Sequence, residues 1–171
     1  MSLRSYVVLA FWCLSLSQAQ ANGPTKPESD KEMASDLRTI QTCLKREYDY
    51  GDRTRCIGVI AKTCESEPAE GYPSVHALAC REREANAWDR VLNETYKRLM
   101  TQFQSNEDDS DDLKAKRIET LRSAQRLWIQ FRDAEMIRMK VDSNEAAASW
   151  GLANIESVRL EMTAKRTIDL D

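Results

Sequence analysis

Few residues in this chain have the type and spacing that catalysis needs. His76 is the single histidine, and the sequence places no second acid, base or nucleophile beside it. Glu82, Glu84 and Asp89 could form a pair of catalytic carboxylates, but arginines alternate with them on one predicted helix, which is typical of a solvated, salt-bridged face. No glycine-rich phosphate loop is present. We therefore predict no catalytic residue and no cofactor.

An acidic run at 106–112 is the strongest metal-like pattern. Asp108, Ser110, Asp112 and Glu119 fall at positions 1, 3, 5 and 12 of a calcium-binding EF-hand loop. Leu113 stands where the sharp turn of that loop needs glycine, and the second half of the run is predicted to be helical. Carboxylates are favourable at a helix N-terminus, where backbone amides are unsatisfied and the dipole is positive. We predict that the run leads into a helix and holds no metal.

Four cysteines remain once Cys13 is assigned to an N-terminal signal segment. None forms a Cys-x-x-Cys pair, which disfavours zinc, and an even number in an exported chain predicts two disulfides. Cys56 and Cys64 would lie ~12 Å apart on one helix, too far for a disulfide. We favour Cys43–Cys56 with Cys64–Cys80, which staple successive helices near their loops. The alternative pairing is Cys43–Cys64 with Cys56–Cys80.

Apolar residues recur at helical spacing along most of the chain, and no useful length alternates as a strand would. Helices are predicted over about 30–48, 53–64, 74–105 and 148–170, with another that follows the acidic run and ends near residue 140. Gly51, in the turn at 49–52, is expected to take a positive φ at a helix end. Two long stripes stand on either side of the acidic run: Trp88, Leu92, Leu99 and Phe103, then Ile118, Leu121, Ala124, Trp128 and Phe131. They predict an antiparallel helical hairpin whose stripes bury each other, and hence an all-α, disulfide-stapled bundle.

The first 21 residues are typical of a signal peptide. Arg4 provides a short basic region, residues 6–16 are apolar but too short to span a bilayer, and Ala19-Gln20-Ala21 fits a cleavage site. We expect cleavage after Ala21, a disordered leader at 22–29 and a single helical domain at 30–171. The protein is then periplasmic or secreted, without a membrane anchor.

The net charge excludes one large class of partner. It is −3 for the whole chain, and removing residues 1–21 takes away only Arg4. A nucleic-acid-binding protein would need a basic face to displace counterions from phosphates. A mildly acidic chain is compatible with a basic protein partner, because opposite net charge speeds encounter.

Three motifs follow one another in the second half of the chain. The first is Cys80-x3-Glu84 with Trp88-Asp89-x2-Leu92-Asn93-x2-Tyr96, the second runs from Leu121 through Ala124-Gln125-Arg126-x-Trp128 to Arg132-Asp133, and the third is Met162-Thr163-Ala164-x-Arg166. Together they resemble the LprI lysozyme-inhibitor N-terminal domain family over about 80–170. Residues 30–79 would then be a disulfide-held helical extension.

The resemblance implies an exported, helical, non-enzymatic domain, with lysozyme inhibition described for the family's namesake. It also implies that the signature residues are structural. These are Glu84, Trp88, Asp89, Leu92, Asn93, Tyr96, Leu121, Ala124, Gln125, Arg126, Trp128, Arg132, Asp133, Thr163 and Arg166.

Our functional hypothesis is an exported protein that binds a basic c-type lysozyme and blocks its cleft sterically. The exposed loop at 65–73 and the acidic run are the candidate contacts, the latter through Asp108, Asp109, Asp111 and Asp112. The alternative is a periplasmic interaction module that binds another envelope protein and does not inhibit lysozyme. A cell-wall enzyme is disfavoured by the missing acid–base set.

Overall fold

The protein is an all-helical bundle in this computed structural model, which describes residues 26–47, 49–143 and 148–171. The predicted signal peptide and the first residues of the predicted leader lie outside these ranges. The described helices are α1 (Lys26–Arg46), α2 (Tyr50–Arg53), the 3₁₀ helix η1 (Thr54–Cys56), α3 (Val59–Glu65), α4 (Pro73–Ser105), α5 (Asp111–Asp142) and α6 (Ala148–Leu170). No described helix is long and apolar enough to cross a membrane. The predicted fold class is confirmed for the described part of the chain.

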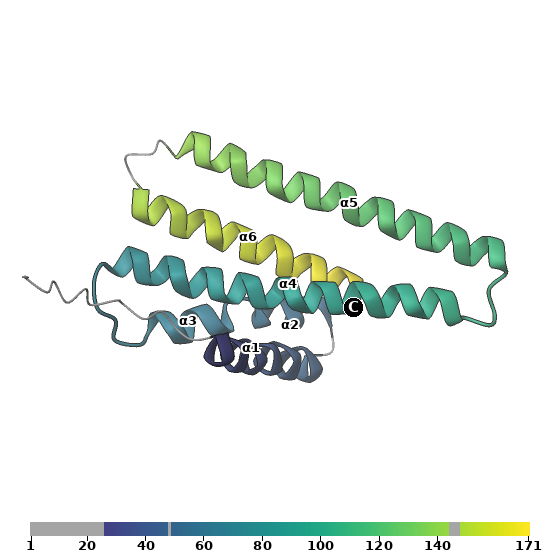
Figure 1. Cartoon of the computed structure of the whole chain (residues 1–171), viewed down its shortest axis with the longest axis horizontal. Helices are drawn as coiled ribbons and strands as arrows, with labels where there is room; N and C mark the ends of the chain where they lie inside the picture. Colours follow the sequence, from purple (N-terminus) through teal and green to yellow (C-terminus); the bar gives the residue numbers. More distant parts are fainter. Residues whose placement is uncertain (1–25, 48, 144–147) are drawn as a thin grey trace, which may run out of the picture.

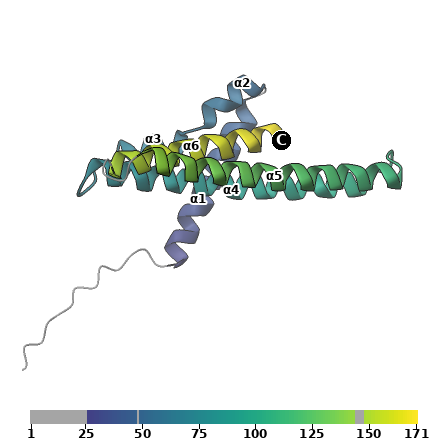
Figure 2. The same ribbon diagram turned by 90° about the horizontal axis from the view of Figure 1, so that it is seen from above.

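α4 is the axis of the molecule (Figures 1 and 2). α5 returns antiparallel to it, and α6 runs parallel to α4 between the two. α1 crosses α4 at a steep angle, and α3 packs on the first part of α4, while α2 stands away from it. Of the described helix pairs, α4 and α6 make the most extensive contact. The main core cluster accordingly joins α1, η1, α3, α4 and α6.

α6, rather than α5, covers most of the apolar stripe of α4. Trp88 and Leu92 are buried as predicted, and Leu121 of α5 is buried as well. Ala124 is exposed, however, and Phe131 is 61% exposed. The prediction that the two stripes bury each other is therefore wrong for these two residues of α5.

Several small side chains are buried on α4 and α6. Ala85 and Ala87 of α4 and Ala153 and Ala164 of α6 are all fully buried. The distance between two packed helix axes depends on the side chains at the contact, and alanine keeps it short. Close packing of α6 leaves α5 at the edge of the bundle, with few large buried side chains of its own.

The helix predicted over 53–64 is broken into three pieces. α2 ends at Arg53 and η1 ends at Cys56. α3 then starts at Val59, after Gly58, whose φ is +89°. A positive φ is strained for any residue with a Cβ, so glycine suits this break. Gly51, by contrast, lies within α2, and the prediction of a positive φ there is wrong.

The carboxylate of Glu84 holds this break in place. Its Oε1 accepts hydrogen bonds from Gly58 N (2.7 Å) and from Trp88 Nε1 (3.0 Å), and its Oε2 accepts from Ile60 N (2.9 Å) and Ala61 N (2.6 Å). The side chain is completely buried, so the prediction that Glu84 belongs to a solvated face is wrong. It caps α3 from a different helix and satisfies amides that a helix start leaves without partners.

Two disulfides connect the short helices to their neighbours. Cys43 of α1 bonds to Cys56, and Cys64 of α3 bonds to Cys80 of α4, with Cα–Cα distances of 5.8 and 5.6 Å. The favoured pairing is confirmed and the alternative is excluded. One reason given for it was wrong, because Cys56 and Cys64 do not share a continuous helix.

α1 begins at Lys26, four residues before the predicted start, so the predicted leader is helical from there on. Pro27 does not prevent this, because proline lacks only an N–H that the first turn leaves without a partner in any case. The helix is fixed to α4 by Asp36, a nearly buried residue that accepts hydrogen bonds from Arg83 at 2.8 and 2.7 Å. These hydrogen bonds raise the pKa of Arg83 above its usual value.

Replacing Glu84 by glutamine tests the cap. The amide keeps one acceptor oxygen but turns an NH₂ group toward N–H donors that are buried, so Glu84→Gln should lower the free energy of unfolding by about 3 kcal/mol. The measurement is urea denaturation followed by circular dichroism. Glu82→Gln is the matched control, because Glu82 is exposed on the same helix, and it should change stability by less than about 0.5 kcal/mol. Equal effects of the two substitutions would contradict the cap.

Removing either disulfide should also be costly. The bonds close chain segments of 13 and 16 residues, and loops of this size stabilise a fold by about 3 kcal/mol in the chain-entropy model. We expect a loss of that order in each of two double variants, Cys43→Ser/Cys56→Ser and Cys64→Ser/Cys80→Ser, measured by denaturation. Peptide mapping of the oxidised protein provides the control for connectivity. A loss below about 1 kcal/mol in both variants would contradict the loop-closure account.

Candidate functional site

The α4–α5 hairpin projects beyond the rest of the bundle (Figures 1 and 2). Asp171, the residue after α6, is level with the middle of the hairpin: its carboxylate accepts a hydrogen bond from Arg53 at 2.9 Å and pairs with Arg98 of α4. The last seven residues of α4 therefore extend ~10 Å past the end of α6. They continue into the loop at 106–110 and the start of α5, which together form the tip of the molecule.

Local hydrogen bonds order the loop at the tip. Asn106 Oδ1 accepts from Asp108 N at 3.3 Å, and Ser110 Oγ accepts from Leu113 N at 3.3 Å, which makes Ser110 the N-cap of α5. Asp111 and Asp112 then occupy the first turn of α5, where the helix dipole favours negative charge. The prediction that the acidic run leads into a helix is confirmed.

The acidic side chains at the tip differ in exposure. Glu107, Asp108, Asp111 and Asp112 are exposed. The carboxylate of Asp109 instead pairs with Arg117 and is only 9% exposed, and the Arg117 guanidinium also lies 5.7 Å from the centre of the Phe103 ring. The tip therefore exposes four carboxylates to solvent, and Asp109 closes the hairpin.

The loop at 65–73 lies at the opposite end of α4 from the acidic tip (Figure 1). Residues 65–73 are all exposed, although Glu65 forms an ion pair with Arg81 at 2.7 Å. A helix of 33 residues separates the two candidate contacts by ~50 Å. One partner of modest size cannot cover both at once, so the candidate site divides into two, and the tip carries the greater charge.

A polar network holds α5 on α4 and α6. Arg132 Nη1 donates to Asp89 of α4 at 3.2 Å, and Arg166 Nε of α6 donates to Gln125 Oε1 at 3.1 Å. The Trp128 ring lies 5.1 Å from the Arg132 guanidinium carbon and 6.0 Å from that of Arg166. Such contacts between cations and an aromatic ring are attractive, and they stabilise the packing of α5 in addition to the hydrogen bonds. Arg132 also pairs with its neighbour Asp133 at 3.0 Å.

The remaining signature residues divide by burial. Trp88, Leu92, Leu121 and Thr163 are buried and Tyr96 is half-buried, while Asn93 is exposed and donates to the Asp89 carbonyl at 2.7 Å. Ala124, Arg126 and Asp133 are exposed on α5. Most of the signature therefore positions helices, and part of it lies on the outer surface of α5.

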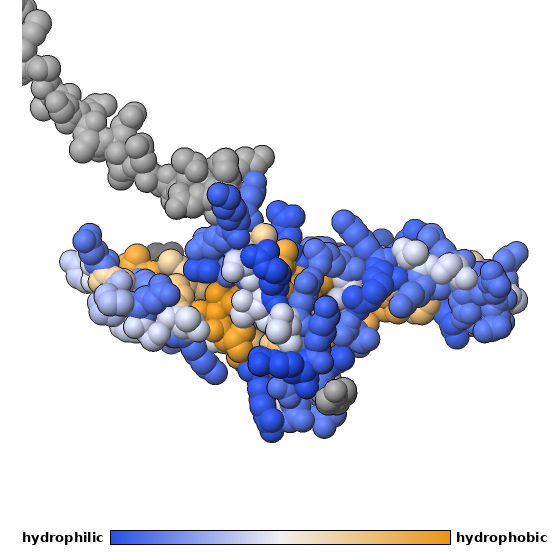
Figure 3. Space-filling model, turned by 90° about the horizontal axis from the view of Figure 1, so that it is seen from below, coloured by the Kyte–Doolittle hydropathy of each residue, from blue (hydrophilic) through white to orange (hydrophobic). Residues whose placement is uncertain are grey.

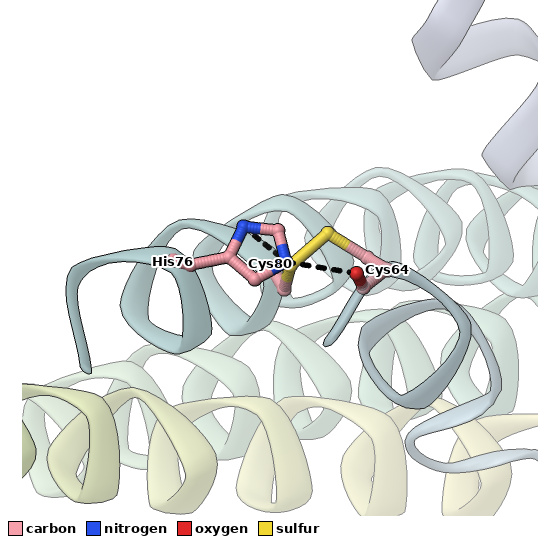
Figure 4. A group of neighbouring side chains, drawn as sticks. All are labelled: Cys64, His76 and Cys80. Atoms are coloured by element: carbon pink, nitrogen blue, oxygen red, sulfur yellow. Dashed lines mark hydrogen bonds between the residues drawn. A yellow bond between two sulfur atoms is a disulfide. The ribbon is translucent and has the colours of Figure 1, made fainter. Parts of the chain in front are cut away.

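Cys64, His76 and Cys80 are grouped closely enough to resemble a metal site (Figure 4), with their possible ligand atoms within 4.8 Å of one another. The two sulfurs are bonded to each other, so neither is the thiolate that a metal would need. The Cys64 carbonyl lies 2.9 Å from His76 Nε2 and can only accept, so Nε2 carries the proton. We therefore interpret His76 as a structural partner of the disulfide.

Two features were missed by the sequence reasoning. Glu84 stands four residues from both Cys80 and Trp88, and a glutamate within an apolar series is a signal for a buried cap. On α5, Leu127 is 63% exposed beside exposed Phe131. It belongs to a second apolar series at helical spacing, which the stripe predicted from Ile118 to Phe131 concealed.

The face that carries α1 to α3 is mainly hydrophilic, with apolar side chains gathered near the middle of the body (Figure 3).

Comparison with known proteins gives one assignment. The family model described as lysozyme inhibitor LprI matches residues 64–170, which include α4, α5, α6 and the Cys64–Cys80 disulfide. No curated protein matches, and no solved structure matches. The family match covers more than half of the chain, and on that basis the protein belongs to the LprI lysozyme inhibitor family.

Proposed function

We propose that this protein is exported and inhibits a basic c-type lysozyme by placing its acidic hairpin tip in or across the enzyme's cleft. The projecting tip is the observation that carries the proposal. Two helix ends and a short loop form a narrow convex element, and four carboxylates lie exposed on it. A convex, negatively charged element suits a concave site on a positively charged enzyme.

The mechanism is steric and requires no catalytic group on this chain. Opposite charges speed the encounter and orient it, and the body of the hairpin then occupies space that the polysaccharide substrate needs. Local order at the tip helps, because the loop bonded through Asn106 and Ser110 loses less conformational freedom on binding than a flexible loop would. Periplasmic or secreted location belongs to the same proposal.

Charge reversal at the tip tests this mechanism. We expect Asp108→Lys/Asp111→Lys/Asp112→Lys to raise the half-inhibitory concentration at least about tenfold and to reduce its salt dependence. The measurement is lysis of a bacterial cell-wall suspension by lysozyme, titrated with the oxidised protein at several salt concentrations. Asp109 is left unchanged because its pairing with Arg117 closes the hairpin.

The matched control carries the same change in net charge at the other end of the molecule. Glu67→Lys/Glu70→Lys/Glu82→Lys alters three exposed acids near that end and should inhibit like the unchanged protein. Equal loss in both variants would show that only overall charge matters, and no loss in the tip variant would exclude the tip.

Absence of inhibition at a large molar excess of the unchanged protein would overturn the proposal itself. The alternative is then a periplasmic interaction module that binds another envelope protein. Capture of such a partner by the unchanged protein, and its loss with either triple variant, would locate the surface that module uses.

A further inference from the structure

We propose that α5 is a self-association surface, on which a second copy of this chain binds antiparallel through the outer face of the helix. The inference does not depend on the proposed function. It begins from the two faces of α5, of which one lies against α4 and α6 and the other is exposed.

The exposed face has the spacing of a helix–helix seam. Thr120, Ala124, Leu127, Phe131, Ala134, Arg138 and Val141 follow one another at alternating steps of four and three residues, and all seven are exposed. This alternation over three heptads is the pattern by which two helices pack side by side. Five of the seven are apolar, and the two largest, Leu127 and Phe131, lie at the centre.

The seam is accessible to another molecule. At 100° per residue it lies roughly 110° around the helix from the inward-facing series that contains buried Leu121 and Gln125 and half-buried Trp128. A second helix can therefore pack on the seam without displacing α4 or α6. Exposed large apolar side chains on a soluble surface are a common mark of a protein interface.

The sequence of the seam is self-complementary when two copies run antiparallel. A two-fold axis next to residue 129 places Leu127 opposite Phe131 of the second copy and Ala124 opposite Ala134 of the second copy. Alanines then lie opposite alanines, and the Leu127–Phe131 pair occurs twice at the centre of the contact, once on each side of the axis. An isologous contact requires this reciprocity.

Both ends of the seam carry ion pairs. Antiparallel pairing brings the C-terminal end of the second α5, where Asp142 pairs with Arg138, toward the N-terminal end of the first, where Arg117 pairs with Asp109. Arg117 and Arg166 line an open groove of about 370 Å³ beside the seam, whose other walls include Phe103, Leu121 and Leu170. The second copy would cover this groove. Parallel pairing would instead set Arg117 against Arg117 and Asp142 against Asp142.

The arrangement leaves both acidic tips accessible. Each tip lies at the N-terminal end of its own α5, so an antiparallel pair directs the two tips to opposite ends of the dimer.

Sedimentation equilibrium of the oxidised full chain across the micromolar concentration range tests the proposal. We expect a monomer–dimer equilibrium, and we expect Leu127→Glu/Phe131→Glu to raise the dimer dissociation constant at least about a hundredfold, because four carboxylates would meet at the centre of the contact. Circular dichroism should show unchanged helix content, since both residues are exposed in the monomer.

Val75→Glu/Tyr72→Glu provides the matched control, because it replaces two exposed apolar residues at the start of α4 by the same charges. This variant should dimerise as the unchanged protein does. A monomer at every concentration, or equal loss in both variants, would overturn the proposal.

Orientation has its own test. A mixture of Leu127→Cys and Phe131→Cys proteins should form an intermolecular disulfide under mild oxidation more readily than either protein alone. Preferential linkage within each separate variant would indicate parallel pairing and overturn the antiparallel register. Lysozyme inhibition measured on the Leu127→Glu/Phe131→Glu monomer separates this proposal from the tip mechanism, which predicts that inhibition persists.

Discussion

The fold depends on one buried carboxylate. Glu84 accepts hydrogen bonds from three backbone N–H groups at the start of α3 and from the indole N–H of Trp88. This one carboxylate thereby fixes the interruption between two helices at Gly58, the short helix α3 and Trp88, the largest fully buried side chain. A helix of seven residues has little stability of its own. It persists here because its N-terminus is capped from α4 and its C-terminal part is bonded to α4 through Cys64 and Cys80.

Sequence patterns predicted the long elements well because long elements repeat their signal. α4, α5 and α6 each contain more than twenty residues, so apolar spacing identifies them and places their ends closely. The short segment at 53–64 was mistaken for one helix, since Ile57, Ile60 and Ala61 fit helical spacing while Gly58 between them requires a positive φ. Local propensity could not reveal that a glutamate 26 residues away would accept the amide of Gly58.

The sequence also did not show which helix would pack most closely against α4. The stripes of α4 and α5 were each recognised, but nothing in a single sequence says that α6 would take the better position on α4. α4 and α6 make the most extensive contact among the described helices, and two helices gain most where their axes approach most closely. Likewise, the carboxylates of the acidic run look equivalent in sequence. Only the folded hairpin distinguishes Asp109, which faces Arg117, from its exposed neighbours.

The position of the tip beyond the end of α6 has a consequence for how this protein can change. Substitutions of the exposed acidic residues at the tip, Glu107, Asp108, Asp111 and Asp112, meet no residue of the main core cluster, so their cost in stability is small compared with that of changes around Glu84 or Trp88. In the proposed mechanism, recognition and folding therefore reside in separate parts of one chain. Such a scaffold can exchange its loop, in nature or in the laboratory, and acquire a new target while its architecture is inherited unchanged.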